Sequence, residues 1–296
     1  MTSGRRLGKI LLVMMAAFIA TGAIASSLMI IAVKAFPPAQ GVQVTLEASA
    51  SMSHAPIGET LVKAFTVSDF GDLLSKKNML ALIIFSVLIG LGSAHLGEKG
   101  RSFSQFLSSA DAVFNKVVGY IMWYAPVGLG AYFAYLAGVF GPQLFGAYAR
   151  AMLIYYPLAF AYFVVAFSGY AYLAARKEGV RSFWGNILPT SLTALATGSS
   201  LAVIPLNLEA AEKTGVPKDI REVVIPIGAT IHMDGSCLSA VLKIALLFGI
   251  FQMDFAGPGT FLTALGVALL SGTVMSGIPS GGFLGEILIV TLYGFP

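Results

Sequence analysis

The chain has 296 residues, of which 57% are hydrophobic and only 11% are charged, and its formal net charge is +4. A soluble domain usually carries about 25% charged residues, so this composition excludes a water-soluble fold, a coiled coil, a disordered chain and a nucleic-acid-binding protein. It predicts an all-α integral membrane protein. The single cysteine, Cys237, excludes a disulfide within the chain and a metal site built from cysteines.

The first apolar run extends from residue 10 to about residue 33 and follows three basic residues. A basic start before an apolar run is also typical of a signal peptide, here with Ala23-Ile24-Ala25 as its cleavage site. The run is longer than the about 7 to 15 residues of a signal-peptide core, and it reaches the about 20 residues that a spanning helix needs. We therefore predict a retained membrane span within residues 1–35.

The next stretch, residues 36–77, is the most polar of the chain and is predicted to lie outside the membrane. Further apolar runs cover about residues 79–95, 113–140, 146–175 and 223–251, and we predict a membrane helix for each. If these spans alternate in direction, the connections that contain most of the lysines and arginines all lie on the same side of the membrane. By the positive-inside rule, that side is the cytoplasm.

Two regions do not fit the pattern of a spanning helix. One has short apolar arms around Thr197-Gly198-Ser199-Ser200, and the other has short apolar arms around the glycine- and serine-rich residues 271–282. Each arm is too short to cross about 30 Å, and irregular backbone in lipid would leave its amides unpaired. We predict re-entrant helical hairpins at about 182–213 and 258–295, entering from opposite sides. Two kinked full-length helices are the alternative.

Asp234 lies between these hairpins, in the middle of an apolar run. A carboxylate is costly there, and the usual reason for one is a cation or proton site. The alternative is a structural Asp held by backbone amides at a helix break. His232 is a ligand, a titrating group or a hydrogen-bonded core side chain. To bring both residues into one site, a local break at Gly235 is required, because residues two apart face different directions on a regular helix.

Paired glycine-interrupted segments are typical of the binding site of a secondary transporter. Free amides at such broken tips bind carboxylates, and unwound carbonyls coordinate cations. Elsewhere, Lys243 and Glu286 both lie in apolar surroundings. We predict that they either pair with each other or extend toward the membrane surface, because an isolated charge within a span is costly.

These segments resemble motifs of the dicarboxylate/amino acid:cation symporter family, the bacterial relatives of glutamate transporters. The resemblance is carried by Pro226–Ser236, by the Ser199-Ser200 tip, by Ser276-Gly277-Ile278-Pro279-Ser280-Gly281-Gly282 and by Tyr124-Ala125-Pro126-Val127-Gly128. It covers nearly the whole chain, from the family's third helix through its second hairpin. It implies a homotrimeric, multi-pass symporter of the bacterial inner membrane that moves a small dicarboxylate or acidic amino acid with Na⁺ or H⁺.

The resemblance also implies roles for parts of the chain. Residues 78–141 would form a static scaffold, and residues 1–35 and 142–296 a moving transport domain. The substrate-binding residues that it implies are Ser199, Ser200, Ser236, Ser276, Gly277, Ile278, Pro279 and Gly281. The cation-site residues that it implies are Asp234, His232, Gly228, Thr230 and Thr21. Neither a catalytic residue nor a cofactor other than the coupling ion is expected.

Several departures from the family pattern leave alternatives open. His232 stands where the family has an asparagine, and Met275 where a threonine helps to hold a cation, so coupling by sodium, by protons or by both is expected. The chain lacks two helices before its first span and a last helix after the second hairpin, which makes a truncated, non-functional transporter fragment the main alternative. A channel is less expected. An intramembrane enzyme is also less expected, because the sequence has neither a His-Glu-x-x-His nor a Gly-x-Ser-Gly motif.

Overall fold

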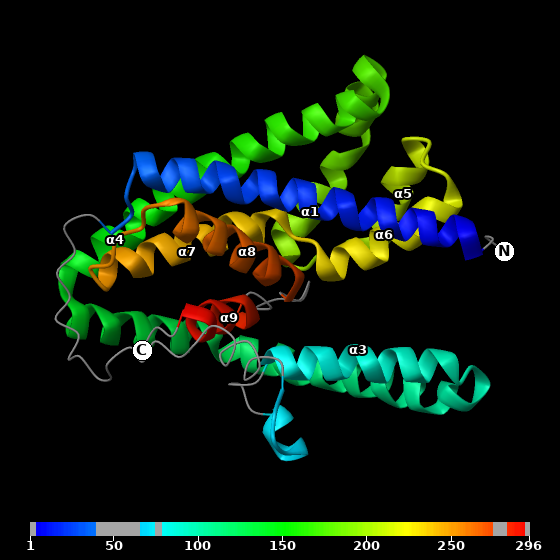
Figure 1. Cartoon of the computed structure of the whole chain (residues 1–296), viewed down its shortest axis with the longest axis horizontal. Coiled ribbons are helices and arrows are strands. Elements are labelled where there is room, and N and C mark those ends of the chain that lie inside the picture. Colours follow the sequence, from blue (N-terminus) through cyan, green and yellow to red (C-terminus); the bar gives the residue numbers. More distant parts are fainter. Residues whose placement is uncertain (1–3, 40–65, 75–78, 275–282, 294–296) are drawn as a thin grey trace. The chain divides into compact units, whose positions relative to one another are not determined.

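The computed structural model describes residues 4–39, 66–74, 79–274 and 283–293. Within these residues the chain is helical and has no strand, which confirms the all-α prediction (Figure 1). The helices are α1 (Gly4–Ala35), a 3₁₀ turn (Phe70–Leu74), α3 (Met79–His95), α4 (Glu98–Thr197), α5 (Ile204–Lys213), α6 (Lys218–Ile231), α7 (Asp234–Ile250), α8 (Pro258–Val274) and α9 (Phe283–Tyr293).

Three helical stretches among the described residues are long and apolar enough to cross a membrane: Arg6–Ala35, Phe145–Thr197 and Lys218–Ile250. A bent pair, Glu98–Ile121 with Pro126–Tyr135, makes a fourth if it is counted as one span. The apolar runs predicted from the sequence therefore become helices, as expected. Of the polar stretch 36–77, the structure describes only residues 36–39 and 66–74, so its extramembrane position stays a prediction.

The chain divides into two compact units, one of residues 43–146 and the other of residues 1–42 and 147–295. In the first unit, α3 turns into α4 at Gly97, whose φ of +53° favours glycine. The turn is held by a hydrogen bond of 2.9 Å between the hydroxyls of Ser93 and Ser104. Further along, α4 bends by 61° between Ile121 and Pro126, as a proline within a helix predicts.

In the second unit, α4 reverses direction at Arg176, which has a positive φ of +56°. The indole of Trp184 donates a hydrogen bond of 2.9 Å to Ser168 Oγ, and its ring centroid lies 5.3 Å from that of Phe163. Sixteen residues of a straight helix would span about 24 Å, so these contacts require the reversal. Residues 177–197 thus form the first arm of the hairpin predicted at 182–213, and α5 forms its second arm. Whether this hairpin is re-entrant stays a prediction.

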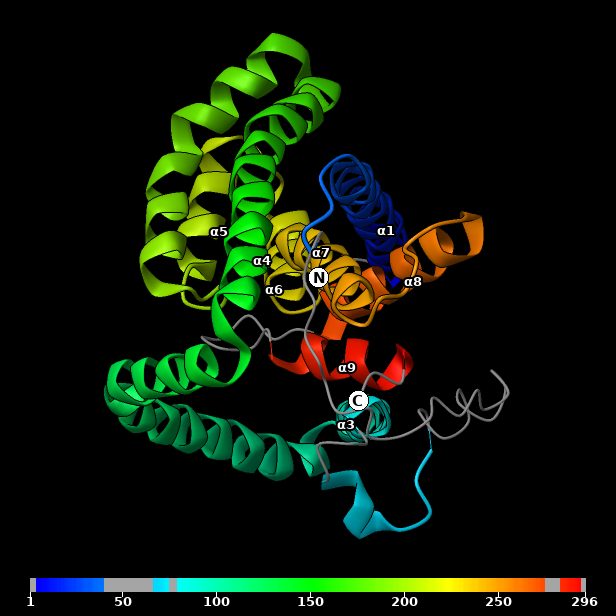
Figure 2. The same ribbon diagram turned by 90° about the vertical axis from the view of Figure 1, so that its left-hand side faces the viewer.

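The core of the second unit surrounds α7. Helices α1 and α8 pack against α7, and both views place the three side by side (Figures 1 and 2). Small residues permit this close packing, as in other membrane bundles. A Cβ atom at Gly272 would lie 2.6 Å from Cys237 Sγ, and one at Gly22 would lie 2.8 Å from Leu269 Cδ2. Helices α8 and α9 are the arms of the hairpin predicted at 258–295, whose tip, residues 275–282, lies outside the described residues.

Candidate functional site

The fifth apolar run is broken in its middle. Helix α6 ends at Ile231 and α7 begins at Asp234, and the two residues between them, His232 and Met233, have extended backbone with φ of −139°. The break therefore lies at His232 and Met233, before Gly235, and not at Gly235, where it was expected from the sequence. Glycine is not required, because extended backbone is accessible to every residue type. Gly235 belongs instead to the first turn of α7.

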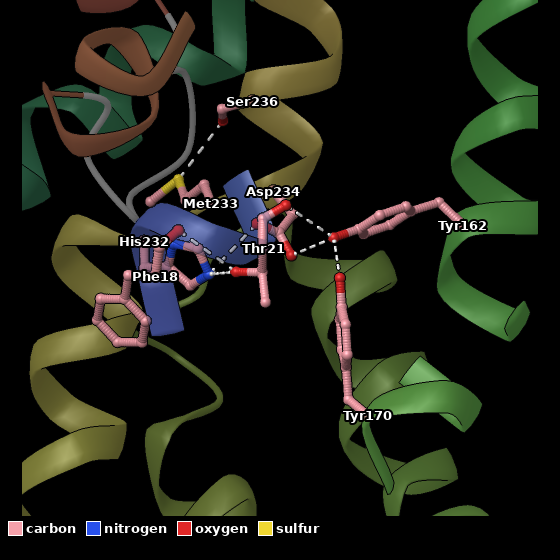
Figure 3. Close-up of polar contacts among 8 residues, drawn as sticks. All are labelled: Phe18, Thr21, Tyr162, Tyr170, His232, Met233, Asp234 and Ser236. Carbon is pink, nitrogen blue, oxygen red and sulfur yellow. Dashed lines mark hydrogen bonds and ion pairs between the residues drawn. The ribbon is translucent and has the colours of Figure 1, made fainter. Parts of the chain in front are cut away.

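Asp234 is buried where α1, α4 and the start of α7 meet (Figure 3). Its Oδ2 accepts a hydrogen bond of 2.8 Å from the hydroxyl of Tyr162, on α4. That hydroxyl also lies 3.0 Å from the hydroxyl of Tyr170 and 3.2 Å from the backbone oxygen of Thr21. A phenol has one hydrogen, and a carboxylate is the strongest acceptor present. We therefore assign that hydrogen to Asp234, with Tyr170 donating to Tyr162.

His232 lies on the other side of the carboxylate. Its ring stacks on Phe18 of α1 with centroids 4.1 Å apart, as Figure 3 shows. Its Nε2 lies 3.0 Å from Thr21 Oγ1 and 3.3 Å from Asp234 Oδ1. Phe18 and Thr21 are three residues apart and share one face of α1. Because the backbone is extended at the break, His232 and Asp234 reach the same point, although they would diverge on a regular helix.

One carboxylate oxygen of Asp234 lacks a hydrogen-bond partner among the described residues. Asp234 Oδ1 is buried and has no hydrogen-bond partner among the described residues, because its contact with His232 does not have hydrogen-bond geometry. Burying a carboxylate oxygen without a partner is costly. A positive charge beside it, either a bound cation or a proton, would remove that cost. The carboxylate and the Thr21 hydroxyl are oxygen ligands of the kind that hard cations favour, whereas the imidazole nitrogen is not.

Two further residues expected at the cation site are not joined to Asp234. The hydroxyl of Thr230 is exposed and donates to the backbone oxygen of Ile227 at 2.7 Å. Gly228 lies on α6, where its backbone oxygen accepts a hydrogen bond of 3.1 Å from the amide of His232. The structure therefore brings together Thr21, His232 and Asp234, while Gly228 caps the end of α6 and Thr230 lies apart.

A pocket of about 430 Å³ lies beside the break. It is lined by residues of α4, of the turn before α5, of the break and of α7: Tyr155, Ser200, His232, Met233, Gly235, Ser236, Ser239 and Lys243. The Tyr155 hydroxyl donates to the backbone oxygen of Gly235 at 3.2 Å. The Ser236 hydroxyl donates to Met233 Sδ at 3.7 Å, and because thioether sulfur is a weak acceptor, a ligand can compete for this hydroxyl.

The expected substrate residues are only partly brought together. Ser200 and Ser236 line this pocket. Ser199 is buried, and its Oγ accepts a hydrogen bond of 3.3 Å from the amide of Ala202, so it stabilises the turn between α4 and α5. The remaining expected residues lie outside the described residues: Ser276, Gly277, Ile278, Pro279 and Gly281.

The two charges in apolar surroundings form a pair. Lys243 Nζ lies 2.6 Å from Glu286 Oε1, which joins α7 to α9. This confirms the first of the two predicted arrangements, pairing rather than extension toward the membrane surface. Neither side chain is buried, since 35% of Lys243 and 48% of Glu286 is exposed.

The sequence analysis missed the tyrosines of α4. Tyr155, Tyr162 and Tyr170 are seven and eight residues apart, so they lie on one face of a helix. A stripe of hydroxyls on one face of an apolar helix is a signal that would have found them, because a buried phenol usually needs a hydrogen-bond partner. The carboxylate partner of Tyr162, Asp234, is 72 residues away along the chain, and no local pattern indicates that contact.

The sequence matches the model of the Sodium:dicarboxylate symporter family over residues 1–296. The chain belongs to this family. The curated relatives of this symporter-family chain are transporters and not enzymes. Together with its apolar helices, this membership makes the chain part of a multi-pass membrane protein.

Three relatives illustrate the range of the family. The chain is 31% identical over 220 residues to a C4-dicarboxylate transport protein of Bacillus subtilis (strain 168), a match that covers 73% of this chain and 51% of that protein. It is 32% identical over 256 residues to the neutral amino acid transporter B(0) of Bos taurus (80% and 43%). It is 31% identical over 226 residues to the excitatory amino acid transporter 1 of Ambystoma tigrinum (74% and 40%). The chain spans about half the length of these relatives, or less.

Proposed function

We propose that the chain forms the substrate- and cation-binding part of a secondary active symporter for a small dicarboxylate or acidic amino acid, driven by Na⁺ or H⁺. The observation that carries this proposal is the environment of Asp234, a buried carboxylate at a helix break with one oxygen unpartnered among the described residues. A buried ionisable group within a span indicates an ion or proton pathway. Membership of a symporter family supports the same function.

Asp234 is the proposed ligand of the driving cation, with Thr21 as a second oxygen ligand and His232 as a modifier of which cation is used. Sodium is a hard cation and is best held by oxygen, so the Nε2 atom that lies 3.3 Å from Asp234 Oδ1 weakens the site for sodium. An imidazole, unlike an amide, can also bind a proton. Protons therefore share or replace the role of sodium. The family name supports sodium as one of the coupling ions.

The pocket lined by Ser200 and Ser236 is the proposed substrate site. Its volume of about 430 Å³ suits a small carboxylate, because small-molecule pockets range from about 300 to 1,000 Å³. Hydroxyl donors from both sides of the pocket would bind carboxylate oxygens. The hairpin tip with Ser276, Gly277, Ile278, Pro279 and Gly281 is proposed to complete the site through its backbone amides, together with Ser199.

The two compact units support a division of labour within the family's architecture. We assign residues 1–35 and 142–296 to a moving transport domain and residues 78–141 to a static scaffold; the boundary between the units, at residues 146 and 147, lies close to this division. A homotrimer in the bacterial inner membrane is the proposed assembly, and the Bacillus subtilis relative supports that location. Cross-linking of the purified protein in detergent tests it, because a ladder ending at a dimer would contradict a trimer.

The function is tested by uptake of radiolabelled succinate and L-aspartate into proteoliposomes, with sodium and pH gradients imposed separately. Uptake should require one of these gradients, and Asp234→Asn should abolish the gradient-driven part. Asp254→Asn is the matched control, because Asp254 is exposed in the connection between α7 and α8. Full coupled uptake by Asp234→Asn, or no uptake by the unaltered protein, would contradict the proposal. Passive conductance without saturation would indicate a channel.

A further inference from the structure

Lys243 is a positive charge in the substrate pocket that the proposed function does not use. Ser236, Ser239 and Lys243 follow one another at intervals of three and four residues along α7, so they share one face of the helix, and all three line the pocket. Helical side chains lean toward the N-terminus of their helix. The Lys243 side chain therefore extends over Ser239 in the direction of Ser236.

The ammonium of Lys243 has donors to spare. It carries three hydrogens, and its pair with Glu286 Oε1, at 2.6 Å, needs one of them. The other side chains that line the pocket are hydroxyls, a thioether and an imidazole. Lys243 is thus the one permanent charge among the lining residues, all of which the structure describes. Glu286 reaches the ammonium from α9 and is not a lining residue.

We propose that Lys243 binds a carboxylate of the substrate and selects ligands with two carboxylates over ligands with one, and that Glu286 competes for the same ammonium. This inference rests on the proposed function, because it takes the pocket as the substrate site. Ser200 and Ser236 bind the first carboxylate near the break, and Lys243 binds the second further along α7. The substrate class that this arrangement favours is a short-chain dicarboxylate.

The physical basis is the strength of a charge-assisted hydrogen bond. An ammonium adds the attraction of a full positive charge to its hydrogen bond with a carboxylate, which a hydroxyl does not, and this attraction grows where water is partly excluded. Glu286 opposes binding in two ways, because it occupies the ammonium and repels the incoming carboxylate. Removing Lys243 should therefore weaken dicarboxylate binding, whereas removing the charge of Glu286 should strengthen it. A pair that only joins α9 to α7 predicts the same sign for both changes.

The experiment is calorimetric titration of the purified protein in detergent, in sodium-containing buffer at neutral pH, with succinate and butyrate as probes. Both acids have four carbons, and they differ by one carboxylate. Lys243→Met should weaken succinate binding at least about tenfold and leave butyrate binding within about twofold, because a hydrogen bond to a charged group contributes about 1.5–3 kcal/mol. Glu286→Gln should tighten succinate binding.

The matched controls are Lys213→Met and Glu209→Gln. These residues form an ion pair of 2.7 Å on α5, their side chains are 58% and 59% exposed, and neither lines the pocket. Neither change should alter the ratio of succinate to butyrate affinity. Lys243→Arg keeps the charge and should retain a preference for succinate, which provides a second variant if Lys243→Met folds poorly.

Four results would overturn the inference. Equal weakening of succinate and butyrate binding by Lys243→Met would show a structural pair. Weaker succinate binding by Glu286→Gln would also show that Lys243 and Glu286 form only a structural pair. Unchanged succinate affinity in Lys243→Met would show that Lys243 does not bind the substrate, and the proposed function would be unaffected. If the unaltered protein bound neither acid, the pocket would not be a carboxylate site and both proposals would fail.

Discussion

The hydroxyl of Tyr162 is hydrogen-bonded to Oδ2 of Asp234 at 2.8 Å, across 72 residues of sequence. This bond ties the middle of α4 to the first residue of α7, at the point where the membrane span is broken. One carboxylate oxygen is thereby held by a neutral donor from the protein. The other, Oδ1, faces His232 and Thr21 and is left for a positive charge.

Replacing Tyr162 by phenylalanine should destabilise the fold without abolishing it. The change removes a hydrogen bond to a buried charged group, which lowers the free energy of unfolding by about 1–2 kcal/mol in a membrane protein. Thermal unfolding in detergent measures the effect. Tyr156→Phe is the control, because the Tyr156 side chain is 64% exposed. Equal unfolding temperatures for the two variants would show that the bond to Asp234 contributes nothing.

His232→Asn should change which gradient drives uptake. The amide supplies a carbonyl oxygen that sodium favours and removes a side chain that can bind a proton. Uptake into proteoliposomes should therefore become more dependent on sodium and less dependent on pH. His95→Asn, an exposed change on α3, should leave both dependences as they are. If His232→Asn also leaves both unchanged, His232 does not modify the choice of cation.

Gly272→Ala should lower the unfolding temperature because there is no room for its methyl group. A Cβ atom at this position would lie 2.6 Å from Cys237 Sγ and 3.5 Å from the backbone oxygen of Met233, so the Cys237 side chain or α8 would have to shift, and overpacking of this kind costs about 1–3 kcal/mol. Gly266→Ala is a control on the same helix, since a Cβ atom there meets nothing within 4 Å. A destabilisation of the same size in both variants would contradict the packing argument.

Gly277→Val should abolish uptake of acidic amino acids or dicarboxylates while membrane insertion is retained. Gly277 lies outside the described residues, and the prediction rests on the need for backbone to approach the ligand closely at a glycine-rich tip. The amount of protein in the membrane fraction and the uptake into vesicles are measured together. Gly259→Val, at an open position near the start of α8, serves as the control. Normal uptake by Gly277→Val would remove the second tip from the substrate site.

Much of the helical architecture was predictable, because an apolar run of sufficient length is a local signal. The exact place of the break was not. A glycine marks where backbone can bend most freely, but His232 and Met233 adopt extended angles that need no glycine. Contacts of His232 with α1, and of Asp234 and Gly235 with α4, stabilise the break. A sequence pattern describes one segment at a time, whereas this break depends on contacts among three segments: α1, α4 and the α6–α7 span.

The candidate site was also predicted only in part, because some of its contacts join distant segments. Thr21, His232 and Asp234 were grouped through the family resemblance, and the structure brings them together. The pairing of Lys243 with Glu286 was one of two predicted arrangements, because the cost of an isolated charge limits the choices. Tyr162 and Tyr155 were missed, since their role depends on how α4 packs against α7 and not on any motif of their own.

The packing of α1 against α7 has a consequence for biosynthesis. About 200 residues separate the end of α1 from the start of α7, and a ribosome that adds about 5 to 20 residues per second needs about 10 to 40 s to make them. Helix α4, with Tyr162 beside the Thr21 backbone, is made within that interval, but His232, the partner of the Thr21 hydroxyl, comes only at its end, and so does α7, against which α1 packs. The main packing partners of α1, helices α7 and α8, are therefore made late, and α1 must stay in the membrane without them for most of synthesis.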